Sequence, residues 1–160
     1  MRVFILFTLG IIMQTFCTAQ PVKTSDLVGT WNNTATVADA WNRAYQFFPN
    51  GTFAFHFSQY DDIGRVRSLR GKYRVHGDTL YLSIQTRIER VGGFVLGGAM
   101  GTEDEWILSK STLQSVDQES PYGEVARSIR LLRRQQWNFI LDDRSDWTYY
   151  RIDSDPDFYH

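Results

Sequence analysis

Residues 52–58 read TFAFHFS, and the alternation within this stretch decides the fold class. Its three phenylalanines, Phe53, Phe55 and Phe57, project to one side of an extended chain, and the residues between them project to the other side. A repeat of two residues is typical of a half-buried β-strand. The stretch therefore predicts a strand whose aromatic side faces a core.

Turn sequences connect this strand to its neighbours. Residues 41–48 (WNRAYQFF) precede it across residues 49–51 (PNG), and these turn residues predict an antiparallel hairpin. Residues 65–75 and 79–88 also alternate, and residues 76–78 (HGD) predict the turn of a second hairpin between them. Two successive hairpins of this kind indicate an antiparallel sheet.

The second half of the chain predicts further short strands. Residues 36–44 are long enough for one or two turns of helix, and helix is otherwise scarce in the sequence. Residues 126–134 carry a strand pattern and a partial helical spacing, and the strand is favoured because a hairpin of residues 137–141 and 147–152 follows. With residues 106–113 included, about eight to ten strands have the spacing typical of sandwiches and barrels. We therefore expect an all-β fold, either an antiparallel up-and-down barrel or a barrel-like sandwich.

The first nineteen residues have the features of a secretory signal peptide. Arg2 supplies a positive charge, residues 3–13 (VFILFTLGIIM) are apolar, and residues 17–19 (CTA) offer small side chains for cleavage after Ala19. The apolar run is too short for a transmembrane helix, which needs about 20 residues. We expect a signal peptide at residues 1–19, export to the periplasm or the medium, and no transmembrane segment in the mature chain.

Cys17 is the only cysteine, and it lies within the predicted leader. Lipid attachment to Cys17 is the alternative to soluble export, but Phe16 and Gln14 stand where lipoprotein leaders usually carry a small and an aliphatic residue. Loss of Cys17 with the leader leaves residues 20–160 without a disulfide, so one apolar core must stabilise them as a single domain. The formal net charge of −1 creates no field that would attract nucleic acid.

Four motifs, in this order along the chain, carry a resemblance to a known family. They are Gly29-Thr30-Trp31, PNGTFAF at residues 49–55, GKYRVHGDTLYLS at residues 71–83 and WTYYRI at residues 147–152. This succession resembles the small exported lipocalin-like domains of bacteria, and the resemblance covers about residues 27–152.

The resemblance implies an up-and-down barrel in which a tryptophan of the first strand closes one end and an arginine of the last strand packs over its indole. Gly29 and Trp31 match the first-strand motif, and Arg151 is the candidate for the arginine. The acidic-aromatic corner of the second lipocalin signature has no clean match, so a shorter or more open barrel stays an alternative. A barrel of eight strands encloses either packed side chains or one small ligand.

Residue types that support metal or acid–base chemistry are sparse. The three histidines, His56, His76 and His160, lack the spacing of metal ligands, and no cysteine of the mature chain accompanies them. Asp61 and Asp62, near His56, favour a solvated loop over a metal site. No nucleophile elbow appears in the sequence. We expect no metal, no cofactor and no enzymatic activity.

The expected function is the binding of a small apolar or amphipathic molecule in the barrel interior. The residues expected to line this interior are Phe53, Phe55, Phe57, Tyr73, Leu82 and Trp106. Alternatively, the same side chains fill the interior, and the domain acts through its surface as a protein-interaction or inhibitor module. The glycine-rich residues 92–101 (GGFVLGGAMG) also have two interpretations: a lid over the open end, or a strand that glycine bends.

Overall fold

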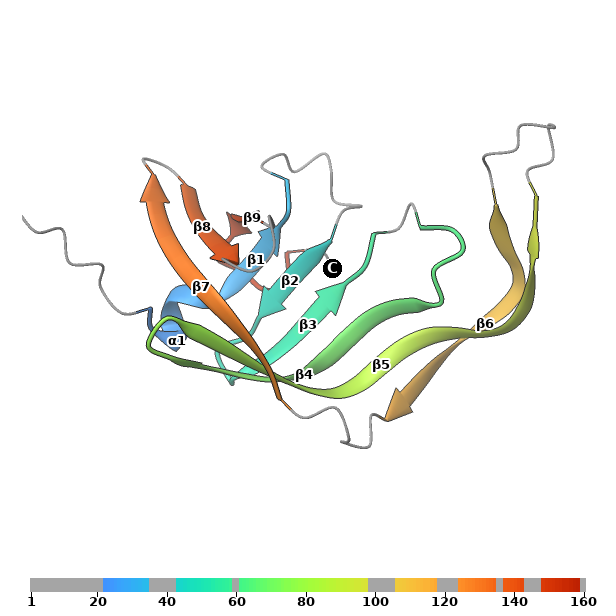
Figure 1. Ribbon diagram of the computed structural model, residues 1–160, viewed down its shortest axis with the longest axis horizontal. Helices are drawn as coiled ribbons and strands as arrows, with labels where there is room; N and C mark the ends of the chain where they lie inside the picture. Colours follow the sequence, from blue (N-terminus) through green and yellow to red (C-terminus); the bar gives the residue numbers. More distant parts are fainter. Residues whose placement is uncertain are drawn as a thin grey trace, which may run out of the picture.

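The structure is a computed structural model that describes residues 22–34, 43–58, 61–97, 106–117, 124–134, 137–142 and 148–158. Its elements are α1 (Thr24–Leu27), β1 (Gly29–Asn32), β2 (Ala44–Phe47), β3 (Thr52–His56), β4 (Val66–His76), β5 (Thr79–Leu96), β6 (Ile107–Asp117), β7 (Glu124–Arg134), β8 (Trp137–Asp142) and β9 (Thr148–Asp153) (Figure 1). The described strands form a single antiparallel sheet. The predicted all-β, antiparallel class is confirmed. The predicted signal peptide at residues 1–19 and residues 36–42 of the predicted helical turn lie outside the described residues.

The hairpin predicted around the PNG turn is confirmed. Strands β2 and β3 pair so that Tyr45 lies opposite Phe55 and Phe47 lies opposite Phe53. Gly51 has a φ of +80°, which few other residues adopt readily, and its N–H donates to the Phe48 carbonyl at 3.1 Å. The second predicted hairpin is confirmed by the pairing of β4 with β5.

Strand β5 is longer than the sequence predicts, because it continues through the first glycine pair. Gly92 and Gly93 have φ values of +70° and +72° and lie within the strand, which ends at Leu96. Lys110 of β6 has a φ of +57° in the same region of the β5–β6 pair. This part of the glycine-rich run is therefore a strand bent at glycine, which was one of its two interpretations.

Strands β6 and β7 share one edge of β5 and run in the same direction. Residues 86–96 of β5 pair with β6, and residues 79–83 of β5 pair with β7. Strand β7 pairs in turn with β8, and β8 pairs with β9, which confirms the strand interpretation of residues 126–134. Because β9 pairs with β1, the order of pairings runs from β1 through β2, β3, β4, β5, β7, β8 and β9 and returns to β1.

One hydrophobic core lies between the facing sides of this curved sheet. Its buried members come from α1 and from strands across the sheet: Leu27, Trp31, Phe47, Phe53, Tyr73, Leu80, Leu82, Ile129 and Tyr149. The alternation predicted for β3 holds, since Phe53 is buried in this core and Phe55 packs against it. Burial of this apolar surface is the main favourable contribution to folding.

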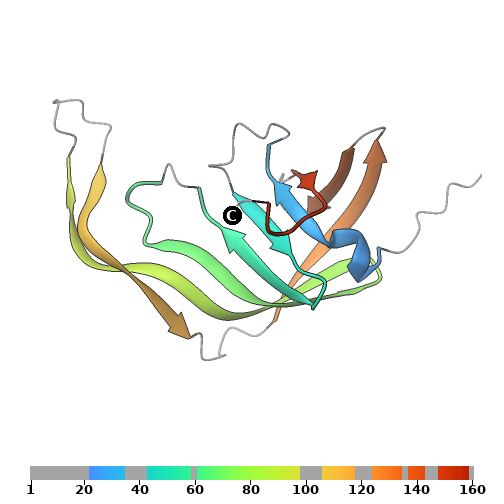
Figure 2. The ribbon, with the colours of Figure 1, turned by 180° about the vertical axis from the view of Figure 1, so that it is seen from behind.

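The segment after β9 lies over the opposite side of β1 and β2, where Figure 2 shows it in front of these strands. Thr30 donates its hydroxyl to the Asp155 carbonyl at 2.9 Å, and the Gln46 amide nitrogen donates to the Pro156 carbonyl at 2.6 Å. Thr30 and Gln46 are buried, although they project away from the apolar core. The C-terminal segment thus provides hydrogen-bond partners for polar side chains on that side.

The short helix α1 is absent from the sequence predictions. The N–H of Lys23 donates to the Asp26 carboxylate at 2.9 Å, which stabilises the first turn. Leu27 at its end is fully buried in the core. The helix has four residues, and no helix within the described ranges is long and apolar enough to cross a membrane.

Candidate functional site

Trp31 and Leu27 are both fully buried in the core. The indole N–H of Trp31 donates to the Leu27 carbonyl at 2.6 Å, so the ring is held by α1. Arg151 of β9 lies opposite Trp31, with its guanidinium carbon 5.7 Å from the centroid of the indole ring. The same guanidinium donates to the carbonyl of Val28. At this distance, a cation above an aromatic face adds about 0.5–2 kcal/mol of stability.

Gly29 allows β9 to approach β1 closely beside this indole. Its φ is +126°, and a Cβ at this position would collide with the backbone carbonyl of Asp153. The three residues predicted to close the interior, Gly29, Trp31 and Arg151, therefore lie together.

The structure divides the six predicted lining residues into three groups. Phe53, Tyr73 and Leu82 are buried members of the core, between 2% and 6% exposed. Phe55 and Phe57 are half-buried. Trp106 lies apart from the other five, just before β6, and is 53% exposed. Sequence alternation finds which side of a strand is apolar, but not which strands extend beyond the core.

Half-buried aromatic residues gather where β3 ends. The ring centroids of Tyr45 and Phe55 are 4.5 Å apart, and those of Phe55 and Phe57 are 5.0 Å apart. Tyr45 also makes an edge-on contact with Tyr149, at 5.0 Å between centroids. Offset and edge-on pairs of this kind are the favoured aromatic geometries. Tyr45 belongs to this aromatic group, although the sequence analysis did not select it.

An ion pair lies on the same side of the sheet as this aromatic group. Tyr45 is opposite Phe55, Phe55 is opposite Leu69, and Leu69 is opposite Arg87. Directly opposite residues project to the same side, so Arg87 faces the interior side of β5. The Arg87 guanidinium contacts the Glu89 carboxylate at 2.7 Å, and their side chains are 36% and 21% exposed.

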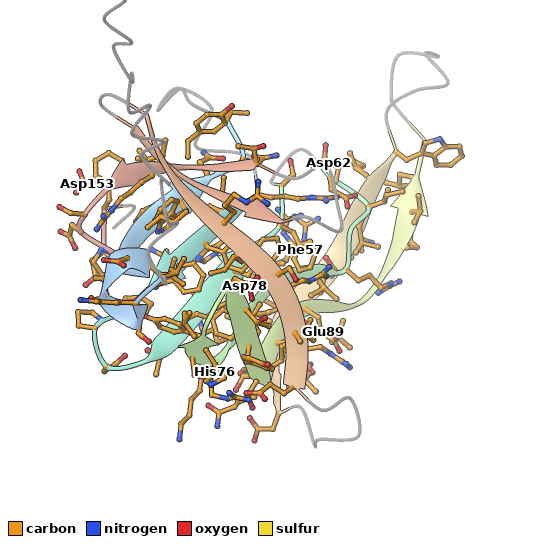
Figure 3. All side chains as sticks on the ribbon, turned by 60° about the vertical axis from the view of Figure 1, so that its left-hand side comes forward. Phe57, Asp62, His76, Asp78, Glu89 and Asp153 are labelled. Carbon is orange, nitrogen blue, oxygen red and sulfur yellow. The ribbon has the colours of Figure 1, made fainter. Side chains whose placement is uncertain are left out.

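The polar residues considered for chemistry do not converge. The His56 ring lies 2.8 Å from the Gln46 side-chain oxygen, on the side away from the core. His76 and Asp62 are exposed, and Figure 3 shows them on opposite sides of the molecule. In the part of the chain that the structure describes, no three His, Cys, Asp or Glu side chains lie close enough to hold a metal ion.

Tyr73 is a buried titratable group of the core. Its hydroxyl donates to the Phe48 carbonyl at 3.1 Å, and burial raises its pKa above the ordinary value of 10.0. A raised pKa means that the folded state binds the phenolic proton more tightly than the unfolded state does. The protonated Tyr73 side chain therefore makes its full contribution to the free energy of unfolding at pH values below the ordinary pKa. The free energy of unfolding then falls as pH rises through the raised pKa.

We therefore expect Tyr73→Phe to remove part of this alkaline loss. Urea unfolding at about pH 8 and about pH 11, on either side of the ordinary tyrosine pKa, measures the difference for each protein. The wild type should lose more stability between the two values than Tyr73→Phe does. Equal losses would contradict a role for Tyr73, since the other tyrosines are common to both proteins.

No protein-family model, no curated protein and no solved structure matches this chain. The function is therefore inferred from the sequence and from the geometry of the described residues.

Proposed function

We propose that this chain is an exported, non-enzymatic module that binds a small apolar or amphipathic molecule inside a lipocalin-like barrel. The cycle of strand pairings from β1 back to β1 supports the barrel form. The packing of Arg151 beside the buried indole of Trp31 supports the likeness to lipocalins. Export rests on the signal-peptide features of residues 1–19.

The observation that carries the binding function is the difference between the two ends of the interior. The Trp31 end is fully buried, whereas Phe55 and Phe57 at the end of β3 are half-buried on the interior side. Apolar pockets with a few polar groups are the usual binding sites for small molecules. The aromatic group formed by Tyr45, Phe55 and Phe57 supplies the apolar surface for such a ligand.

The polar neighbours of this group favour an amphipathic ligand over a purely apolar one. Arg87 and Glu89 lie on the strand next to Leu69 and form a half-buried ion pair at the edge of the apolar surface. A ligand whose tail lies on the aromatic group would place its head near this pair. Hydrogen bonds to charged groups contribute about 1.5–3 kcal/mol each, so the head would add to affinity.

Titration with N-phenyl-1-naphthylamine, an uncharged apolar fluorescent probe, tests the binding function. We expect the probe to bind the wild type, and Phe57→Ser to weaken binding by about 10–100-fold. This factor corresponds to the roughly 1.5–3 kcal/mol that burial of a phenylalanine contributes. Phe158→Ser is the matched control, because Phe158 is 39% exposed in the C-terminal segment on the opposite side of β1 and β2. Absence of probe binding, or equal losses in the two variants, would refute the proposal.

The burial of three of the six predicted lining residues favours a second function. Phe53, Tyr73 and Leu82 pack in the core, so these three side chains fill interior space. A filled interior would leave the surface as the functional part, in a protein-interaction or inhibitor module. Failure of the probe to bind the folded wild type would favour this alternative.

A further inference from the structure

Residues 90–96 of β5 and residues 107–113 of β6, with the adjoining Gly97 and Trp106, form a two-stranded ribbon, here called the β5–β6 ribbon, that projects from the rest of the molecule (Figures 1 and 2). The pairing of β4 with β5 stops at Val66, the first residue of β4, which lies opposite Glu89. The Arg90 N–H donates to the Arg65 carbonyl just beyond it. Past this point, β5 pairs with β6 alone among the described strands.

Exposed apolar side chains are concentrated on this ribbon. Of the large apolar side chains that are exposed among the described residues, seven lie on it: Val91, Phe94, Val95, Leu96, Trp106, Ile107 and Leu113. Leu113 is 65% exposed and Trp106 is 53% exposed. A concentration of exposed apolar side chains commonly marks an interaction surface.

The backbone of β6 has one partner outside β5 at Leu108, whose N–H donates to the Asp62 carbonyl at 3.2 Å. Strand β6 stands at the end of the strand order, and β5 is its only partner among the described strands. A two-stranded ribbon alone is only marginally stable in water, and a third strand is normally needed. An open strand edge offers unpaired N–H and C=O groups to another chain. The ribbon therefore combines exposed apolar side chains with an edge that, from Ser109 to Asp117, has no neighbouring strand besides β5 among the described strands.

We propose that β6 pairs in antiparallel orientation with β6 of a second copy of this chain, so that two ribbons form one four-stranded sheet. A two-fold axis normal to such a sheet must place one residue opposite itself. Leu113, the most exposed of the ribbon's apolar residues, is the residue we assign to the axis. This register places Lys110 opposite Val116, so the only cation of β6 does not meet another cation.

A second copy fits the surface better than a lipid bilayer does. The sequence that joins the two strands of the ribbon ends in Glu103, Asp104 and Glu105, directly before Trp106. Carboxylates are costly to transfer out of water, and anionic lipid headgroups would repel them. The inference goes beyond ligand binding, because it uses none of the interior residues.

Sedimentation equilibrium of the full chain tests this association. The wild type should be dimeric at about 10 µM, and Leu113→Glu should raise the dimer dissociation constant by at least about 100-fold, the effect expected when a central contact is lost. Phe158→Glu is the control for an added charge at another exposed apolar residue and should leave the constant unchanged. A monomeric wild type, or a Leu113→Glu chain that dimerises equally well, would overturn the proposal.

Oxidation of Leu113→Cys tests the edge pairing itself. Opposite residues of antiparallel strands have Cα atoms about 4.5–5.5 Å apart, which suits a disulfide. We expect a disulfide-linked dimer from Leu113→Cys and none from Lys72→Cys, an exposed residue of β4. The wild type, with Cys17 alone, measures background cross-linking. A dimer that does not cross-link at residue 113 would overturn the edge pairing. A wild type that stays monomeric and binds phosphatidylcholine–phosphatidylglycerol vesicles would overturn the choice of a second copy.

Discussion

Replacement of Trp31 by alanine is expected to lower the free energy of unfolding by about 3–5 kcal/mol, the usual cost of truncating a buried tryptophan. The Trp31 side chain is fully buried and donates to the Leu27 carbonyl at 2.6 Å. Its loss would leave a cavity and remove the surface on which Arg151 packs. Urea unfolding followed by far-ultraviolet circular dichroism measures the effect without relying on tryptophan fluorescence.

Trp106→Ala is the matched control for this substitution. Trp106 is 53% exposed and lies outside the core, so its removal should change stability by no more than about 0.5 kcal/mol. Similar losses in the two variants would mean that Trp31 contributes no more to the stability of the core than an exposed tryptophan does. The contrast therefore separates a structural indole from an exposed one of the same chemistry.

Alanine at Gly71 is expected to cost about 1–3 kcal/mol, as overpacking of a core usually does. A Cβ at Gly71 would collide with the backbone carbonyl of Ser83 in the neighbouring strand, and a strand carbonyl cannot rotate away as a side chain can. The collision occurs where Gly71 lies opposite Ile84 and Arg70 lies opposite Thr86, so that β5 contains one extra residue. Thermal unfolding of Gly71→Ala checks the expected loss of stability.

Gly97→Ala provides the comparison for Gly71→Ala. A Cβ at Gly97 would make only an ordinary contact with the Trp106 ring, at 3.8 Å, and the φ of Gly97 is not in the left-handed region. Its melting temperature should match that of the wild type. A Gly71→Ala protein as stable as Gly97→Ala would show that β4 and β5 are not packed as closely as described.

Alternation and turn residues were sufficient to predict most of the strands. The phenylalanines of β3 do face one interior, because a strand with one apolar side has only one favourable orientation. The course of β5 through Gly92 and Gly93 stayed one of two interpretations, because glycine pairs normally indicate a turn and sequence alone does not separate a bent strand from a lid. The shared edge of β5 was missed, since the sequence does not show that β6 and β7 both pair with it.

The candidate site was predicted only in part, and the bulge in β5 explains one omission. Continued alternation from Ile84 places Thr86 on the core side and Arg87 on the outer side. The extra residue at the bulge reverses this order, so that Arg87 lies opposite Leu69 on the interior side. Trp106 was assigned to the interior because it is a large aromatic residue near a strand, and only the projection of the β5–β6 ribbon places it elsewhere.

Nuclear Overhauser effects across two strand pairs test most directly whether the strands enclose one interior. We expect contacts between Trp31 of β1 and Arg151 of β9, and between Leu82 of β5 and Val125 of β7. We also expect slow hydrogen exchange of the Trp31 indole N–H, which is buried and bonded to the Leu27 carbonyl. Missing contacts at either pair, together with an indole N–H that exchanges as fast as that of exposed Trp106, would contradict a shared interior.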